Sequence, residues 1–137
     1  MWWIYALLSA FFASVTAVSA KIGITNVNSN LATAIRTCVI LLVAWGIVFT
    51  RGEAKGLATL SKQNILFLII SGIATGLSWI FYFKALQLGK VSQVAPVDKL
   101  SVALTIVLSV LFLGEALTIK TAIGALFIIV GTLILIL

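Results

Sequence analysis

Residues 65–83 read ILFLIISGIATGLSWIFYF, nineteen consecutive residues without a charge. As an α-helix this stretch would be about 28 Å long, close to the hydrocarbon thickness of roughly 30 Å in a bilayer. Its polar and apolar residues do not alternate, and it is about twice as long as a strand of a membrane barrel. The stretch therefore predicts a transmembrane α-helix.

Four more apolar stretches of similar length lie on either side of this one. Polar, glycine-containing or charged segments separate them, as expected where helices end. The five predicted spans cover about residues 3–20, 31–50, 65–83, 91–113 and 122–137. The fold class is therefore an all-α membrane protein, with a single transmembrane domain over residues 1–137.

The composition agrees with a chain that has lipid as its solvent. Hydrophobic residues make up 63% of the chain and charged residues 9%, too few to cover the surface of a soluble domain. The net charge of +6 comes from single basic residues between apolar runs, which favours anionic lipid headgroups over nucleic acid as partners. With no His and one Cys (Cys38, in an apolar run), we expect no metal site, no cofactor and no enzymatic activity.

The cationic residues are divided almost equally between the two sides of the membrane. The side of the N-terminus carries four, Arg51, Lys55, Lys62 and Lys120. The opposite side carries three, Lys21, Lys84 and Lys90, and two more lie slightly inside the membrane there, Arg36 and Lys99. The positive-inside rule needs an imbalance to set the orientation. Either hydrophobicity and the first helix set it, or the chain inserts both ways and pairs as an antiparallel dimer.

Polar side chains recur at helical spacing along two spans, which places them on one face of each helix. The face on the third span contains Ser71, Thr75, Ser78 and Tyr82, with Trp79 nearby. The face on the fourth span contains Asp98, Ser101, Thr105 and Ser109. The first span adds Thr16, whereas Thr132 is alone in the interior of the fifth. Such residues also serve close helix packing, as Gly72-x-x-x-Gly76 would. Taken together, they predict a polar cavity lined by the first, third and fourth spans.

Three ionisable residues lie inside the predicted spans, where a charge at the helix centre costs about 2.5–3.5 kcal/mol. Arg36 and Asp98 have similar depths, so we predict that they form an ion pair. Lys99 lies about 100° round the helix from Asp98 and would reach headgroups, another element or an anionic substrate. Pro96 predicts a kink one turn before Lys99, which is typical of mid-membrane binding sites but also occurs without a function. We include Asp98 and Lys99 among the residues of the cavity.

The stretch ALQLGKVSQVAP over residues 85–96, followed by LSV (100–102) and LFLGE (111–115), resembles the EamA family of the drug/metabolite transporter superfamily. Arg36-Thr37, Ile123-Gly124 and GTL (131–133) agree with it, so the resemblance extends over essentially the whole chain. It implies export or exchange of small metabolites by alternating access, with a cavity lined by the first, third and fourth helices. Most members have ten helices in two inverted five-helix repeats, whereas this chain has one repeat.

A single repeat can complete the ten-helix arrangement by pairing with an oppositely inserted copy. We therefore expect a secondary transporter of small polar or amphipathic metabolites, working as an antiparallel homodimer in the inner or plasma membrane. The alternative is a non-transporting membrane subunit that scaffolds or modifies a partner transporter. The small multidrug members of the superfamily depend on a Glu in the first helix, and this chain has none there. We expect Glu115, in the turn between the fourth and fifth spans, to cap the fifth span or to place a negative charge at its start.

Overall fold

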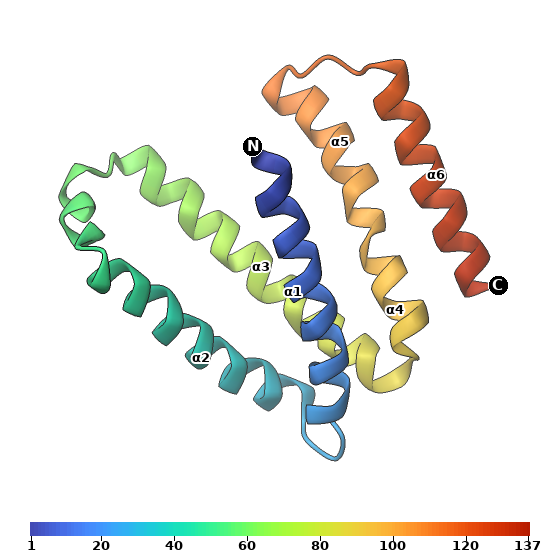
Figure 1. Cartoon of the computed structure of the whole chain (residues 1–137), viewed down its shortest axis with the longest axis horizontal. Helices are drawn as coiled ribbons and strands as arrows, with labels where there is room; N and C mark the ends of the chain where they lie inside the picture. The colour runs from blue at the N-terminus through green and yellow to red at the C-terminus, as the bar shows by residue number, and fades with distance from the viewer. The chain divides into compact units, whose positions relative to one another are not determined.

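The computed structural model describes residues 1–137 and consists of helices joined by short turns (Figure 1). The elements are α1 (Trp2–Gly23), α2 (Ser29–Thr50), the 3-10 helix η1 (Glu53–Thr59), α3 (Lys62–Leu88), α4 (Val91–Asp98), α5 (Leu100–Leu113) and α6 (Ile119–Ile136). Five helical stretches are long and apolar enough to cross a membrane, and α4 with α5 forms the fourth of them. The prediction of an all-α membrane protein with five spans is confirmed.

Most helices extend a few residues beyond the predicted spans. The helix α3, for example, continues from Phe83 to Leu88. Hydropathy marks only the part of a helix that lies in hydrocarbon, whereas Lys84 and Gln87 favour helix and continue it toward the headgroups. The helices are therefore longer than the apolar spans that hydropathy predicts.

The chain divides into two compact units, one made of residues 20–87 and the other of residues 1–19 and 88–137. The first unit is held together where the turn after α1 meets the end of α3. The Lys21 ammonium donates a hydrogen bond to the Leu86 carbonyl, and the Gln87 amide donates one to the Val27 carbonyl. Lys21 thereby satisfies a carbonyl at the C-terminal end of α3, where the helix itself supplies no N–H. The buried apolar side chains of this unit are Ile24, Phe83 and Leu86, and Ser29 and Thr33 are buried as well.

Asparagines shape the turn between α1 and α2. Asn26 has a left-handed backbone with φ of 62°, which Asn tolerates better than most residues. The side chain of Asn28 caps α2 by accepting hydrogen bonds from the backbone N–H groups of Asn30 and Leu31.

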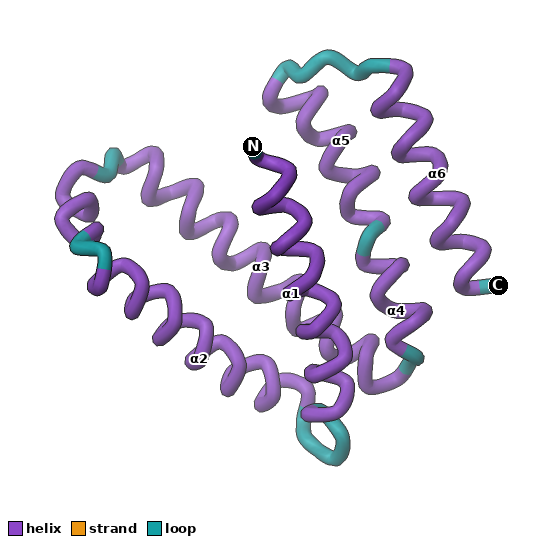
Figure 2. The backbone as a smooth tube through the Cα atoms, in the orientation of Figure 1, coloured by secondary structure: helices purple, strands orange, loops and turns teal.

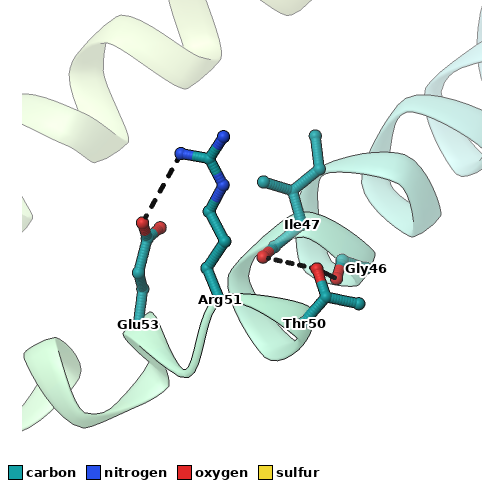
Figure 3. Close-up of polar contacts among 5 residues, drawn as sticks. All are labelled: Gly46, Ile47, Thr50, Arg51 and Glu53. Carbon is teal, nitrogen blue, oxygen red and sulfur yellow. Dashed lines mark hydrogen bonds and ion pairs between the residues drawn. The ribbon is translucent and has the colours of Figure 1, made fainter.

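The other end of α2 is shown in Figure 3. The Thr50 hydroxyl donates to the carbonyls of Gly46 and Ile47, at 2.9 and 3.0 Å, so its hydrogen bonds stay within the helix. Gly52 then reverses the chain with φ of 68°, and Arg51 pairs with Glu53 at 3.9 Å. Both charged side chains are well exposed, so this pair contributes little to stability.

The second unit contains the interrupted fourth span. Figure 2 shows the short break between α4 and α5. At the break the Lys99 N–H bonds to the Pro96 carbonyl three residues back, at 3.0 Å, instead of four residues back as in an α-helix. Pro96 itself has no N–H to donate to the preceding turn, which weakens the helix on that side.

The helix α6 runs beside both α4 and α5 (Figure 1). Its one buried residue is Thr132, 4% exposed, whose hydroxyl donates a hydrogen bond of 3.2 Å to the Pro96 carbonyl. The turn before α6 begins at Gly114, with φ of 67°, and ends at Thr118, whose hydroxyl accepts from the Thr121 N–H. Thr118 therefore caps α6, and the expected capping role of Glu115 is wrong, because Glu115 lies outside the first turn.

Replacing Thr132 by Val should lower the free energy of unfolding by about 0.6–1.7 kcal/mol, the range for one interhelical hydrogen bond in a membrane. Valine keeps the shape of the side chain but leaves the Pro96 carbonyl without this donor. The matched control is Thr50→Val, which removes a hydroxyl bonded only within its own helix (Figure 3). SDS-induced unfolding followed by circular dichroism measures both variants, and equal losses would show that the interhelical bond adds nothing.

Candidate functional site

The strongest chemical feature inside the spans is a guanidinium held on aromatic rings. Arg36, on α2, lies over the Trp79 ring at 4.4 Å and over the Phe83 ring at 5.1 Å, both measured from the guanidinium carbon to the ring centre. Trp79 and Phe83 are four residues apart on α3, so they share one face of that helix. Cation–π attraction holds the charge toward α3, and Tyr82 adds an electrostatic interaction.

This contact lies within the membrane-spanning part of the unit. Arg36 is seven residues after the start of α2 at Ser29, and Trp79 is nine residues before the end of α3 at Leu88. At 1.5 Å per residue these positions are about 10 and 13 Å along their helices. The hydrogen bonds of Lys21 and Gln87 bring the end of α3 to the turn from which α2 starts. Phe83 is five residues before Leu88, about 7.5 Å along α3. The guanidinium, which contacts both rings, therefore lies close to the depth of its own backbone.

The unit of residues 20–87 is strongly basic. It contains six cationic residues, Lys21, Arg36, Arg51, Lys55, Lys62 and Lys84, and one acidic residue, Glu53. Glu53 pairs with Arg51 at the other end of α2 (Figure 3). The one carboxylate of this unit is therefore paired with Arg51 and not with Arg36.

A pocket of about 370 Å³ lies at the end of this unit where Lys21 bonds to α3. Its lining is polar apart from one side chain and consists of Lys21, Ile24, Thr25, Asn26 and Gln87. The pocket has a basic group and amides but no acidic group, so it favours neutral or anionic ligands.

The predicted polar face of α3 lies open along the helix. Ser71, Thr75 and Ser78 are all exposed, and Trp79 and Tyr82 are partly exposed. The Thr75 hydroxyl bonds to the Ser71 carbonyl of its own helix at 2.8 Å, which reduces the cost of placing it in lipid. No other element of this unit covers these hydroxyls.

The second unit holds the remaining predicted residues. Asp98 and Lys99 form an ion pair of 3.3 Å at the break between α4 and α5. Ser101 and Thr105 are exposed on α5, and the Thr105 hydroxyl bonds to the Ser101 carbonyl at 2.8 Å. Thr16, on α1, is half-buried. The predicted ion pair of Arg36 with Asp98 would join the two units, and it stays a prediction.

The sequence did not predict the roles of two residues, Phe83 and Thr132. Phe83 is a second ring beneath the Arg36 guanidinium. Its spacing of four residues from Trp79 places both rings on one face of α3 and could have indicated this role. Thr132 bonds to the Pro96 carbonyl, and the signal was its isolation in an otherwise apolar span. An isolated hydroxyl in hydrocarbon needs a partner.

Five helices of membrane-spanning length, with a cation and hydroxyls inside the spans, define a multi-pass membrane protein with polar groups at bilayer depth. The chain belongs to the EamA-like transporter family, whose family model matches residues 1–137. It is therefore a membrane transporter, in contact with lipid and with a transported small molecule, and the resemblance described above is confirmed.

Individual relatives agree with this assignment. A Sinorhizobium protein, described as an uncharacterized transporter in the cobO 3′ region, is 48% identical over 134 residues, 98% of this chain and 95% of that protein. An uncharacterized protein of Methanocaldococcus jannaschii is 31% identical over 98 residues, 72% of this chain and 65% of that protein. No solved structure matches the chain.

Proposed function

We propose that the chain is a secondary transporter of small polar or amphipathic metabolites that works by alternating access as an antiparallel homodimer. In this proposal residues 1–137 form one five-helix domain, and two copies inserted in opposite directions form the cavity between them. The membrane would be the inner or plasma membrane, where both orientations are accessible to the insertion machinery.

The observation that carries the proposal is the open polar face of α3. Ser71, Thr75 and Ser78 are exposed in the single chain, although the span around them is otherwise apolar. In membranes, interfaces between helices are enriched in small and hydroxyl-bearing residues, which hydrogen-bond across the contact or line a cavity. A second copy would cover this face and turn it into the wall of a cavity.

Two further facts support a partner that is a copy of the same chain. The Sinorhizobium relative is covered over 95% of its length, so it too has the size of a single repeat. The cations on the two sides number four and three, which permits insertion in both orientations. The proposed cavity residues are Thr16, Ser71, Thr75, Ser78, Trp79, Tyr82, Asp98, Lys99, Ser101 and Thr105.

Labelling of single cysteines in intact cells tests the dual insertion. In a Cys38→Ala background, Gly56→Cys in η1 and Ser92→Cys at the start of α4 place one thiol on each side of the membrane. Neither substitution changes a charge, and a Cβ at Gly56 meets no atom within 4 Å. With dual insertion, an impermeant thiol reagent should label about half of each variant before permeabilisation and all of it afterwards.

A single orientation gives a different pattern. One cysteine would then be labelled completely and the other not at all until the cells are permeabilised. That result would rule out the antiparallel homodimer. The second repeat would have to come from another protein, or the chain would be a non-transporting subunit of a partner transporter.

A further inference from the structure

The Arg36 guanidinium contacts aromatic side chains of α3. The guanidinium has five N–H groups, and its contacts with the chain are the rings of Trp79 and Phe83 and an electrostatic interaction with Tyr82. The guanidinium carbon lies 4.4 and 5.1 Å from the ring centres of Trp79 and Phe83. An aromatic face, unlike a carboxylate, does not accept two parallel hydrogen bonds from a guanidinium. The planar N–H edges therefore have no carboxylate partner within residues 20–87, where Glu53 is paired with Arg51.

An anion would complete the interactions of this guanidinium. A cation–π contact offsets only part of the cost of placing an arginine inside a span. The two rings keep the guanidinium near the depth of its own backbone, so it reaches the headgroups less readily than an unrestrained arginine. The rings also hold the guanidinium in place, so that a ligand would meet a fixed, oriented group.

The surroundings of Arg36 favour an anion over any other ligand. Lys21 and Lys84 lie nearer the end of α1 and the end of α3, and the pocket of about 370 Å³ lies at that same end of the unit. Glu53, the one carboxylate of the unit, is paired with Arg51 at the opposite end of α2. Asp98, in the other unit, already has Lys99 as an ion-pair partner at 3.3 Å. Such a one-sided charge distribution attracts anions into the spans.

We infer that Arg36 is the recognition group for a carboxylate or phosphate, so that the substrate of the proposed transport carries such a group. The planar guanidinium matches either anion with two parallel N–H donors. Trp79 and Phe83 act as positioning residues that hold the guanidinium flat against α3.

Trp79 itself can report on the binding. Its indole lies 4.4 Å from the charge, so an anion that neutralises or displaces the guanidinium changes its fluorescence. The variant Trp2→Phe/Trp3→Phe/Trp45→Phe keeps Trp79 as the sole tryptophan. The full chain is placed in phosphatidylcholine nanodiscs and titrated with succinate or inorganic phosphate at constant ionic strength, maintained with chloride. Succinamide serves as the uncharged counterpart of succinate.

The expected result is a saturable change in Trp79 emission with at least one of the two anions and none with succinamide. In Arg36→Gln the apparent Kd should rise at least tenfold, and Arg36→Lys should bind more weakly than the parent because Lys lacks the planar pair of donors. Arg51→Gln, outside the spans and already paired, should leave the response unchanged. No saturable response to either anion, or an equal response in Arg36→Gln, would overturn the inference.

Two other outcomes also overturn it. A change caused only by phosphatidylglycerol in the nanodisc would mean that Arg36 holds a lipid headgroup and not a substrate. A response that appears only in Asp98→Asn would identify Asp98 as the counter-ion of Arg36.

The inference and the proposed function fail in different measurements. No fluorescence response together with half-labelling of Gly56→Cys would reject the anion site but support the antiparallel dimer. A single orientation together with a response that depends on Arg36 would support the anion site but reject the antiparallel dimer.

Discussion

Removing lysines from one side of the membrane should convert a mixed population into a single orientation. The N-terminal side has four cations and the opposite side has three outside the spans. Lys55→Gln/Lys62→Gln/Lys120→Gln leaves one against three, and Lys84→Gln/Lys90→Gln leaves four against one. By the positive-inside rule, about nine-tenths of Gly56→Cys should be labelled in intact cells in the first variant and about one-tenth in the second.

These lysines are suitable because the fold does not depend on them. All five are exposed, and none forms a hydrogen bond or an ion pair in the structure. Lys21 is on the same side as Lys84 but is not used, because its bond to the Leu86 carbonyl holds the end of α3. A change of topology in these variants would therefore reflect charge and not misfolding.

Co-purification with two different affinity tags then tests the dimer. Each lysine variant alone should fail to capture a second copy of itself, since two chains of one orientation cannot form the antiparallel pair. The two variants expressed together should capture each other as well as the parent chain captures itself. Self-association of either variant at the parental level would contradict the antiparallel dimer even if the labelling result holds.

The substitution Leu86→Ala should have the largest effect on stability, lowering the free energy of unfolding by about 2–4 kcal/mol. Leu86 is completely buried, with 0% of its surface exposed, and it lies where the end of α3 meets the turn after α1. Truncation would leave a cavity beside the Lys21 hydrogen bond. The unit has few other buried side chains, so its neighbours can do little to compensate.

Leu88→Ala is the matched control, because Leu88 is two residues away and 80% exposed. We expect it to change the free energy of unfolding by less than about 0.5 kcal/mol. SDS titration of both variants at equal protein-to-detergent ratio compares them. Similar unfolding midpoints for the two variants would mean that the contact at the end of α3 does not hold the unit together.

The sequence was sufficient for the spans because one physical quantity decides them. A run such as residues 65–83 has no charge over the thickness of a bilayer, and only a helix satisfies its backbone there. The polar face of α3 also followed from the sequence, since the spacing of Ser71, Thr75 and Ser78 is fixed by the helical period. The residues that share a face of one helix can be predicted without knowing which helices pack against it.

The contacts of the charged residues could not be derived in this way, because they depend on which helices meet. Depth alone suggested Asp98 as the partner of Arg36, and that ion pair stays a prediction. The ring contacts of Arg36 with Trp79 and Phe83 were not predicted. Lys99 was expected to reach headgroups, another element or an anionic substrate, whereas in the structure its side chain pairs with the neighbouring Asp98. An angle of about 100° between neighbouring residues on a helix separates their backbone attachment points but not their flexible ends.

The break at Lys99 makes α4 a short helical segment that can change its angle to α5. Its eight residues are about 12 Å long, so a rotation of about 20° at the break would carry the Val91 end by roughly 4 Å. The bond from Thr132 attaches at Pro96, close to the pivot, where such a rotation displaces atoms least. Such a rotation would therefore strain the bond from Thr132 less than the contacts of α6 with the Val91 end of α4.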